Sequence, residues 1–194
     1  MKGISGKVNP HTKRGKRLKS RRQNIPRYGV GVKSFKEIMA VVRRERRRGK
    51  KIVTTNGCFD ILHLGHIRNL AKAKSLGDIL IVGVNSDKSI KSYKGRNRPI
   101  VREKDRAEVL AALQAVDYVF IFNDKTPNRW LAKIRPDAHA KGADRKIGQI
   151  VERETVIRGG GRVVLVPYIK DRSTTNVIKK INKFYASFKG PASK

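Results

Sequence analysis

Residues Thr54 to His66 read TTNGCFDILHLGH and come directly after a short apolar run that is typical of a strand. The turn that begins at Asn56 lets the backbone approach a ligand closely, because a glycine follows it. His63 lies three residues before His66, with Gly65 between them, so both imidazoles fall on one side of the helix that starts here. A helix N-terminus also offers unpaired N–H groups and the positive end of the helix dipole. The stretch therefore predicts a strand, a tight turn and a helix start that hold the phosphates of a nucleotide.

Apolar runs and helical patterns alternate on both sides of this stretch. The expected strands are residues 52–55, 78–84, 118–122, 137–140 and 162–166. The expected helices are residues 34–49, 64–76, 103–115, 127–134, 146–158 and 174–188. This order predicts an α/β fold, a doubly wound parallel sheet with helices on both faces. In such sheets the ligand binds beyond the carboxyl ends of the strands, which is where the motif at 54–66 falls.

The composition points to a polyanionic partner. The 194 residues include 47 Lys and Arg but only 15 Asp and Glu, so the net charge is +32. Residues 1–51 hold nineteen of the basic and two of the acidic residues, so the rest of the chain is strongly basic too. Such a balance predicts binding to RNA or DNA ahead of an anionic membrane surface, which we do not expect as a partner.

Other features bear on the location of the chain. Cys58 is its single cysteine, so no intrachain disulfide can form and a reducing compartment fits. There is no apolar run of transmembrane length, and no apolar segment follows the basic N-terminus as in a secretory signal. A mitochondrial presequence is also basic, but glycines and prolines interrupt any amphipathic helix here. We expect a cytoplasmic location, with an organellar one as the alternative.

The basic residues divide the chain into an arm (1–33), an arginine-rich helix (34–50), an α/β domain (51–188) and a tail (189–194). The arm holds eleven Lys and Arg and no Asp or Glu, and it is too poor in apolar residues to fold alone. We expect it to be disordered when free and ordered on RNA, although a solvated tail that aids solubility would look similar. The candidate RNA contacts in the arm are Lys13, Arg14, Lys16, Arg17, Lys19, Arg21, Arg22 and Arg27.

The arginine-rich helix begins with a capping-box pattern, Ser34 and Glu37, and ends before Gly49. Cations at a helix C-terminus complement its dipole, which explains part of the arginine cluster. The cluster exceeds what capping needs, so we interpret it as a second RNA-backbone contact, made by Arg43, Arg44, Arg46, Arg47 and Arg48.

Five motifs, in order and spacing, resemble the cytidylyltransferase-like nucleotidyltransferases, most closely the adenylyltransferase unit of ADP-heptose synthase. They are TNGCFDILHLGH (55–66), VNSDKSIKSYKG (84–95), RPIVREKDRAEVLAAL (98–113), VDYVFIF (116–122) and DRSTTNVI (171–178). The similarity covers about residues 51–183 and leaves out the arm and the arginine-rich helix. It implies a Rossmann-like nucleotidyltransferase fold.

The resemblance also implies a reaction, in which a substrate phosphate attacks the α-phosphate of ATP or CTP and pyrophosphate leaves. Such a transfer depends on positioning and charge stabilisation rather than on a covalent nucleophile. The resemblance assigns catalysis to His63, His66, Lys94 and Arg172. It assigns nucleotide contacts to Asn56, Gly57, Phe59, Gly65, Lys141, Gly142, Asp144, Ser173, Thr174 and Thr175, and substrate contacts to Asp60 and Asp87. Mg²⁺ is expected with the nucleotide, but no carboxylate cluster identifies its ligands.

Plain structural roles compete with several of these assignments. Phe59 fits packing as well as nucleotide contact, Asp60 a turn hydrogen bond, Asp87 a helix cap and Lys94 a surface charge. Arg145 stands where the family commonly has an aromatic residue, which puts the contacts of the loop that begins at Lys141 in doubt.

Two functional hypotheses stay open at the level of sequence. One is a nucleotidyltransferase that activates a sugar phosphate such as heptose 1-phosphate and is bound to RNA or the ribosome through its arm. The alternative is a non-catalytic, ribosome-associated structural protein recruited from this enzyme family. The sequence also leaves open whether the chain forms a homodimer.

Overall fold

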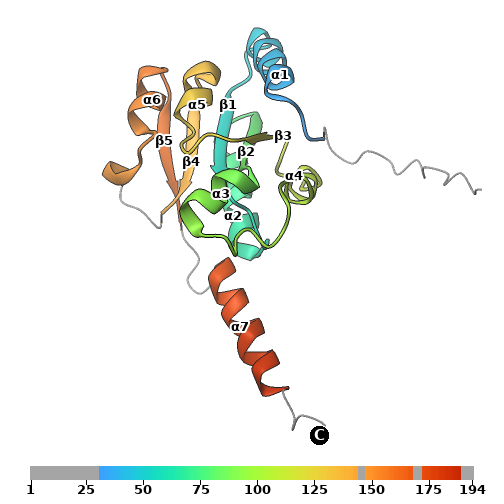
Figure 1. Ribbon diagram of the computed structural model, residues 1–194. Helices are drawn as coiled ribbons and strands as arrows, with labels where there is room; N and C mark the ends of the chain where they lie inside the picture. Colours follow the sequence, from blue (N-terminus) through green and yellow to red (C-terminus); the bar gives the residue numbers. More distant parts are fainter. Residues whose placement is uncertain (1–30, 144–146, 168–171, 189–194) are drawn as a thin grey trace, which may run out of the picture.

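The computed structural model describes residues 31–143, 147–167 and 172–188. Five parallel strands form one sheet in the order β3-β2-β1-β4-β5 (Figure 1). They are β1 (Ile52–Gly57), β2 (Ile79–Asn85), β3 (Tyr118–Phe122), β4 (Ala138–Gly142) and β5 (Arg162–Val166). The chain winds from β1 outward to β2 and β3, then returns past β1 to β4 and β5. The expected Rossmann-like doubly wound sheet is confirmed, and its switch point lies between β1 and β4.

Helices cover both faces of the sheet. The helices are α1 (Phe35–Arg47), α2 (Leu64–Lys74), α3 (Asp87–Lys94), α4 (Glu103–Ala111), α5 (Asn128–Ile134), α6 (Arg153–Arg158) and α7 (Thr174–Ser187). Apolar residues of α2 and α4 pack on one face, where Leu70 and Leu110 are buried. Residues of α1, α5 and α6 pack on the other face, around Phe120 and Trp130. Two apolar cores therefore hold the sheet rigid beneath its loops.

Helix α1 is part of this domain rather than an appendage. Its residues Ile38, Val41 and Val42 are buried against the sheet. The capping box at its start is present, since the Ser34 side chain accepts from the Glu37 amide and the Glu37 carboxylate accepts from the Ser34 amide. The division at residue 51 is therefore a change of composition, not a gap in packing.

The structure holds one helix that was not expected, and it divides another that was. The sequence pattern overlooks α3, which Ser86 caps by accepting from the Ser89 amide. The expected helix over 146–158 is instead a 3₁₀ turn, Ile147–Gln149, followed by the short α6. Gly148 weakens a continuous helix there.

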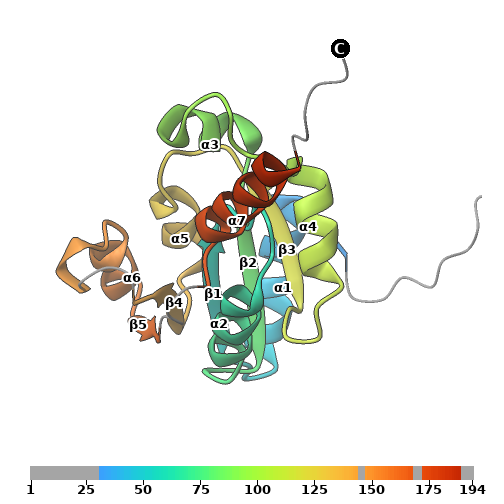
Figure 2. The ribbon, with the colours of Figure 1, turned by 90° about the horizontal axis from the view of Figure 1, so that it is seen from below.

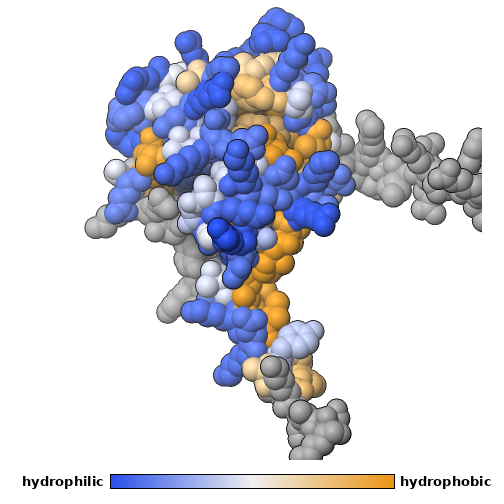
Figure 3. Space-filling model, in the orientation of Figure 1, coloured by the Kyte–Doolittle hydropathy of each residue, from blue (hydrophilic) through white to orange (hydrophobic). Residues whose placement is uncertain are grey.

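Helix α7 extends away from the sheet below the other helices, as two views at right angles show (Figures 1 and 2). Ser173 caps it by accepting from the Asn176 amide at 3.1 Å. Hydrophobic residues lie along one side of this helix (Figure 3), and Ile181 and Phe184 are among its exposed apolar side chains. Within the described residues, no helix is both long and apolar enough to cross a bilayer.

Candidate active site

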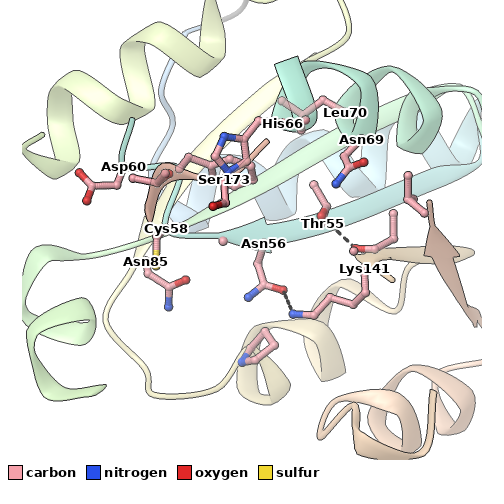
Figure 4. Close-up of a pocket in the computed structure, with 18 of the residues that line it drawn as sticks. Thr55, Asn56, Cys58, Asp60, His66, Asn69, Leu70, Asn85, Lys141 and Ser173 are labelled. Atoms are coloured by element: carbon pink, nitrogen blue, oxygen red, sulfur yellow. Dashed lines mark hydrogen bonds between the residues drawn. The ribbon is translucent and has the colours of Figure 1, made fainter. Parts of the chain in front are cut away.

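A cleft of about 730 Å³ opens at the carboxyl ends of β1 and β4 (Figure 4). That volume suits a nucleotide-sized ligand. Most of the predicted site residues line it: Asn56, Gly57, Phe59, Asp60, His63, Gly65, His66, Lys94, Lys141, Gly142, Arg172, Ser173, Thr174 and Thr175. The structure therefore gathers residues from three of the motifs and from the loop that begins at Lys141, which are far apart in the sequence. Asp87 is not among the lining residues, and Asp144 lies outside the described residues.

His63 and His66 stand together at the start of α2. Their rings stack with centroids 3.9 Å apart, and Phe59 packs against the His66 ring at 5.4 Å. The backbone at Phe59 has a positive φ of 49°, which turns the loop sharply before the helix. Among the described residues, the Nδ1 atoms of both histidines are buried and lack a hydrogen-bond partner. Phe59 thus acts as the packing partner of an imidazole pair that keeps hydrogen-bonding capacity for a ligand.

Gly65 allows two helix starts to meet. A Cβ at this position would lie 2.9 Å from the His63 ring and 3.1 Å from the carbonyl oxygen of Arg172, too close for any other residue without a shift. The Thr174 hydroxyl donates to the Ile61 carbonyl at 3.1 Å and ties the start of α7 to the loop before α2. The positive ends of two helix dipoles therefore point toward the same part of the cleft, which favours anionic phosphates there.

Burial keeps both imidazoles neutral near pH 7. It lowers the pKa of His63, and burial together with the nearby His63 and Lys94 lowers the pKa of His66 to about 4. A neutral imidazole still donates one hydrogen bond, and an arriving phosphate raises its pKa by stabilising the charged form. The pair can therefore donate to phosphate oxygens at neutral pH.

Besides Lys141, four cationic side chains line the same cleft. Lys94, at the end of α3, and Arg172, just before α7, are the two predicted from the sequence. Arg98, the first residue of the motif at 98–113, and Lys125 also line it, although neither was assigned a role from the sequence. Because Arg98 is ion-paired with Asp60 at 3.0 Å, its charge is partly matched. The charges of the other cationic side chains are suited to neutralising a polyphosphate.

Asp60 and Asp87 are engaged in holding the loops around the cleft. The Asp60 carboxylate accepts from the backbone amides of Ile100 and Val101, at 2.8 and 2.9 Å. Asp87 is ion-paired at 2.8 Å with Arg106, a fully buried side chain that sequence reasoning did not single out. Both carboxylates therefore have structural partners, although not the expected ones: Ser86 caps α3 in place of Asp87, and the partners of Asp60 lie far away in the sequence rather than in a local turn.

Lys141 and Asn56 form another part of the cleft wall, at the ends of β4 and β1. The Lys141 ammonium donates to Asn56 Oδ1 at 3.0 Å (Figure 4). Neighbouring Thr55 donates to the Ala140 carbonyl at 2.9 Å, which holds the two strand ends together. Lys141 is also ion-paired with Glu152, a buried carboxylate that the sequence did not mark.

The cleft holds donors suited to phosphate rather than to a resident metal. Among the described residues, no three His, Cys, Asp or Glu side chains are grouped so that they could hold an ion. Its carboxylates Asp60 and Glu152 are each paired with a cation. The described residues therefore identify no ligands for a divalent ion, and Asp144 lies outside them.

Of the candidate RNA contacts, only the five arginines at positions 43 to 48 lie within the described residues, and none of them lines this cleft. All those of the arm, Lys13 through Arg27, fall outside the described residues. On α1, Arg44 and Arg48 contact the buried Glu45, and Arg46 donates to the Arg135 carbonyl. Within the described part of the chain, the side chains of Arg43 and Arg47 form no ion pair or hydrogen bond. Intramolecular contacts therefore account for three of the five arginines, while the side chains of Arg43 and Arg47 have no such contact among the described residues.

Comparison with known proteins agrees with this geometry. A family model described as cytidylyltransferase-like matches residues 54–180. The bifunctional protein HldE of Geobacter sulfurreducens is 46% identical over 154 residues, which are 79% of this chain and 31% of the relative. HldE of Klebsiella pneumoniae is 50% identical over 155 residues, 80% of this chain and 32% of the relative. The chain thus spans about a third of the length of these curated relatives.

Solved structures share the fold. The lipopolysaccharide core biosynthesis protein from Thermoplasma volcanium superposes with a TM-score of 0.53 at 32% identity, over 63% of this chain and 98% of that chain. Pantoate-beta-alanine ligase from Francisella tularensis gives a TM-score of 0.52 at 16% identity, over 80% of this chain and 78% of that chain. The second likeness concerns the fold alone.

Proposed function

Since the chain belongs to the cytidylyltransferase-like family of nucleotidyltransferases, we propose that it transfers a nucleotidyl group from ATP or CTP to a sugar phosphate such as heptose 1-phosphate. The substrate phosphate attacks the α-phosphorus of the nucleotide, and pyrophosphate leaves in line. One observation carries the proposal: the stacked His63 and His66 face a cleft where two helix starts meet.

Each group has a role that follows from its position. His63 and His66 donate to oxygens on the reacting phosphate, where negative charge increases in the transition state. The start of α7, with Ser173, Thr174 and Thr175, holds the β- and γ-phosphates, and Arg172 and Lys94 neutralise the leaving pyrophosphate. Mg²⁺ would enter with the nucleotide and would help to neutralise the charge of its phosphates. These groups need only position and stabilise, so no covalent enzyme intermediate is required.

Turnover tests this proposal directly. The full chain with Mg²⁺, heptose 1-phosphate and either ATP or CTP should release pyrophosphate, and release should stop when EDTA removes the metal. The assay is repeated with other sugar and alditol phosphates, because the sugar is not fixed by the residues described. A chain that releases pyrophosphate with none of them is not a transferase of this kind.

RNA binding is a second proposed function, and it is favoured by the net charge of +32 and by the uncommitted Arg43 and Arg47. It is compatible with catalysis, because the arginine cluster lies on α1, away from the cleft residues. If the chain binds RNA but shows no turnover, the alternative function, a non-catalytic, ribosome-associated protein, is the one supported.

The full chain should bind RNA with a steep salt dependence. Each neutralised phosphate contributes about 0.7 to 0.9 to the slope of log K against log salt. Deleting residues 1–30, which keeps α1 and both cores, should lower that slope by several units in a filter-binding or fluorescence titration. A truncated chain with an unchanged slope would show that the arm is not the anchor. The double variant Arg43→Gln, Arg47→Gln then measures how much α1 contributes to the salt dependence of RNA binding.

A further inference from the structure

Glu152 is a buried carboxylate in the wall of the cleft. It precedes α6 at the position of an N-cap, yet its side chain makes no capping hydrogen bond. The side chain is only 3% exposed and is directed toward β4 instead. A buried carboxylate is retained only where cations or donors compensate it. Its contacts therefore indicate what it does.

Two residues of β4 compensate Glu152. Lys141 forms an ion pair with Glu152 Oε1, and His139 Nε2 lies 3.5 Å from the same oxygen. Burial would raise the pKa of Glu152, but the contact with His139 and the charge of Lys141 outweigh it and hold the pKa at about 2. The carboxylate is thus charged at any pH where the protein works.

His139 connects this pair to β1. Burial lowers the pKa of His139, so its ring is neutral. A neutral ring next to the carboxylate carries its hydrogen on Nε2, which leaves Nδ1 to accept from the Thr54 hydroxyl at 2.8 Å. Thr54, His139 and Glu152 are all buried. The position of Glu152 is therefore fixed from both central strands.

The ion pair has two consequences for the cleft. The charge of Lys141 is matched, so this part of the wall attracts phosphate less than the starts of α2 and α7 and the cationic Arg172 and Lys94 do. An ammonium can only donate, so it also obliges Asn56 to turn its amide oxygen toward Lys141. The Asn56 amide nitrogen then points away from Lys141 (Figure 4), where it can donate to a ligand.

Resting on the nucleotidyl transfer proposed above, we infer that Glu152 is a positioning residue for the nucleoside half of the nucleotide. By pairing with Lys141 it orients the Asn56 amide and keeps this part of the cleft close to neutral. The nucleotide then binds in one direction, with its phosphates at the starts of α2 and α7 and its nucleoside beside Asn56 and Lys141.

The test is direct binding to the full chain, measured by calorimetry with Mg²⁺ and two probes. One probe is the α,β-methylene analogue of ATP or CTP, and the other is inorganic tripolyphosphate, which lacks the nucleoside. Glu152→Gln, which keeps the shape of the side chain and removes its charge, should lower the affinity for the analogue about tenfold. It should bind tripolyphosphate as tightly as the wild type or more tightly, because Lys141 is no longer neutralised. Glu154→Gln, at an exposed carboxylate two residues away, should change neither.

Further variants separate positioning from general damage. Lys141→Met should lower the affinity for the analogue to a similar degree. The double variant should bind the analogue no more weakly than either single variant, because both substitutions break the same ion pair. Equal weakening of analogue and tripolyphosphate in Glu152→Gln would overturn the inference, and so would unchanged affinity for the analogue. If Glu152→Gln binds the analogue with unchanged affinity while the wild type turns over substrate, the role of Glu152 is wrong but the proposed nucleotidyl transfer stands. If the wild type binds neither analogue, the proposed function fails with it.

Discussion

Replacing His66 with alanine should lower kcat for nucleotidyl transfer by about 100- to 1,000-fold, the usual effect of removing one donor to a developing oxyanion. His66 is held for this task by its neighbours: Phe59 packs on its ring, and His63 stacks on it at 3.9 Å. Burial keeps it neutral, with a pKa of about 4. Its Nδ1 has no partner among the described residues, so truncation removes no hydrogen bond at that atom. We therefore expect the melting temperature to change by only a few degrees.

The measurement is steady-state pyrophosphate release, with kcat and KM obtained separately. A fall in kcat with a smaller change in KM is the signature of an interaction made mainly in the transition state. Arg68→Ala is the matched control, because Arg68 is exposed on the same helix and does not line the cleft. A His66→Ala variant with wild-type kcat would remove the imidazole pair from the mechanism.

Arg106→Met should destabilise the fold by about 3 to 5 kcal/mol, the usual cost of breaking a buried ion pair from one side. The Arg106 guanidinium donates to the Asn85 carbonyl and to Asp87 Oδ1, at 2.9 and 2.8 Å. It also donates to the carbonyls of Val101 and Cys58. Methionine fills much of the space but leaves these acceptors without a donor. Because they lie at the ends of β1 and β2 and in the loops beside them, the cleft should loosen as well.

Chemical denaturation followed by circular dichroism measures this effect, and the melting temperature should fall by about 10 °C. Arg102→Met, at an exposed position in the same segment, should stay within about 0.5 kcal/mol of the wild type. An Arg106→Met variant that unfolds at the wild-type denaturant concentration would mean that the buried guanidinium holds nothing together.

The strands and the phosphate-binding end of the cleft could be predicted because local patterns determine them. The apolar run of β2 is short and rich in β-branched residues, which favours a buried strand, and His63 with His66 falls at a helix start wherever that helix packs. Ser173 likewise caps α7 through contacts within its own turn. The short, polar α3 does not stand out in the sequence because Ile90 and Tyr93 are the only apolar side chains among its eight residues.

Arg106 and Glu152 could not be predicted because their roles come from residues distant in the sequence. Each lies in a segment rich in charged side chains, and nothing local distinguishes Arg106 from Arg102 or Glu152 from Glu154. The fold alone buries one member of each pair and exposes the other. Asp60 shows the reverse, since the motif marks it while its carboxylate is engaged with Ile100, Val101 and Arg98.

The fate of each nucleotide phosphate tests the central claim most directly. Wild-type chain is incubated with Mg²⁺, heptose 1-phosphate and nucleotide labelled with ³²P either at the α- or at the γ-position. Attack on the α-phosphorus predicts that the α-label appears in the nucleotide-sugar product and the γ-label in pyrophosphate. Transfer of the γ-label to the sugar phosphate, or its release only as orthophosphate, would contradict a cleft built for nucleotidyl transfer.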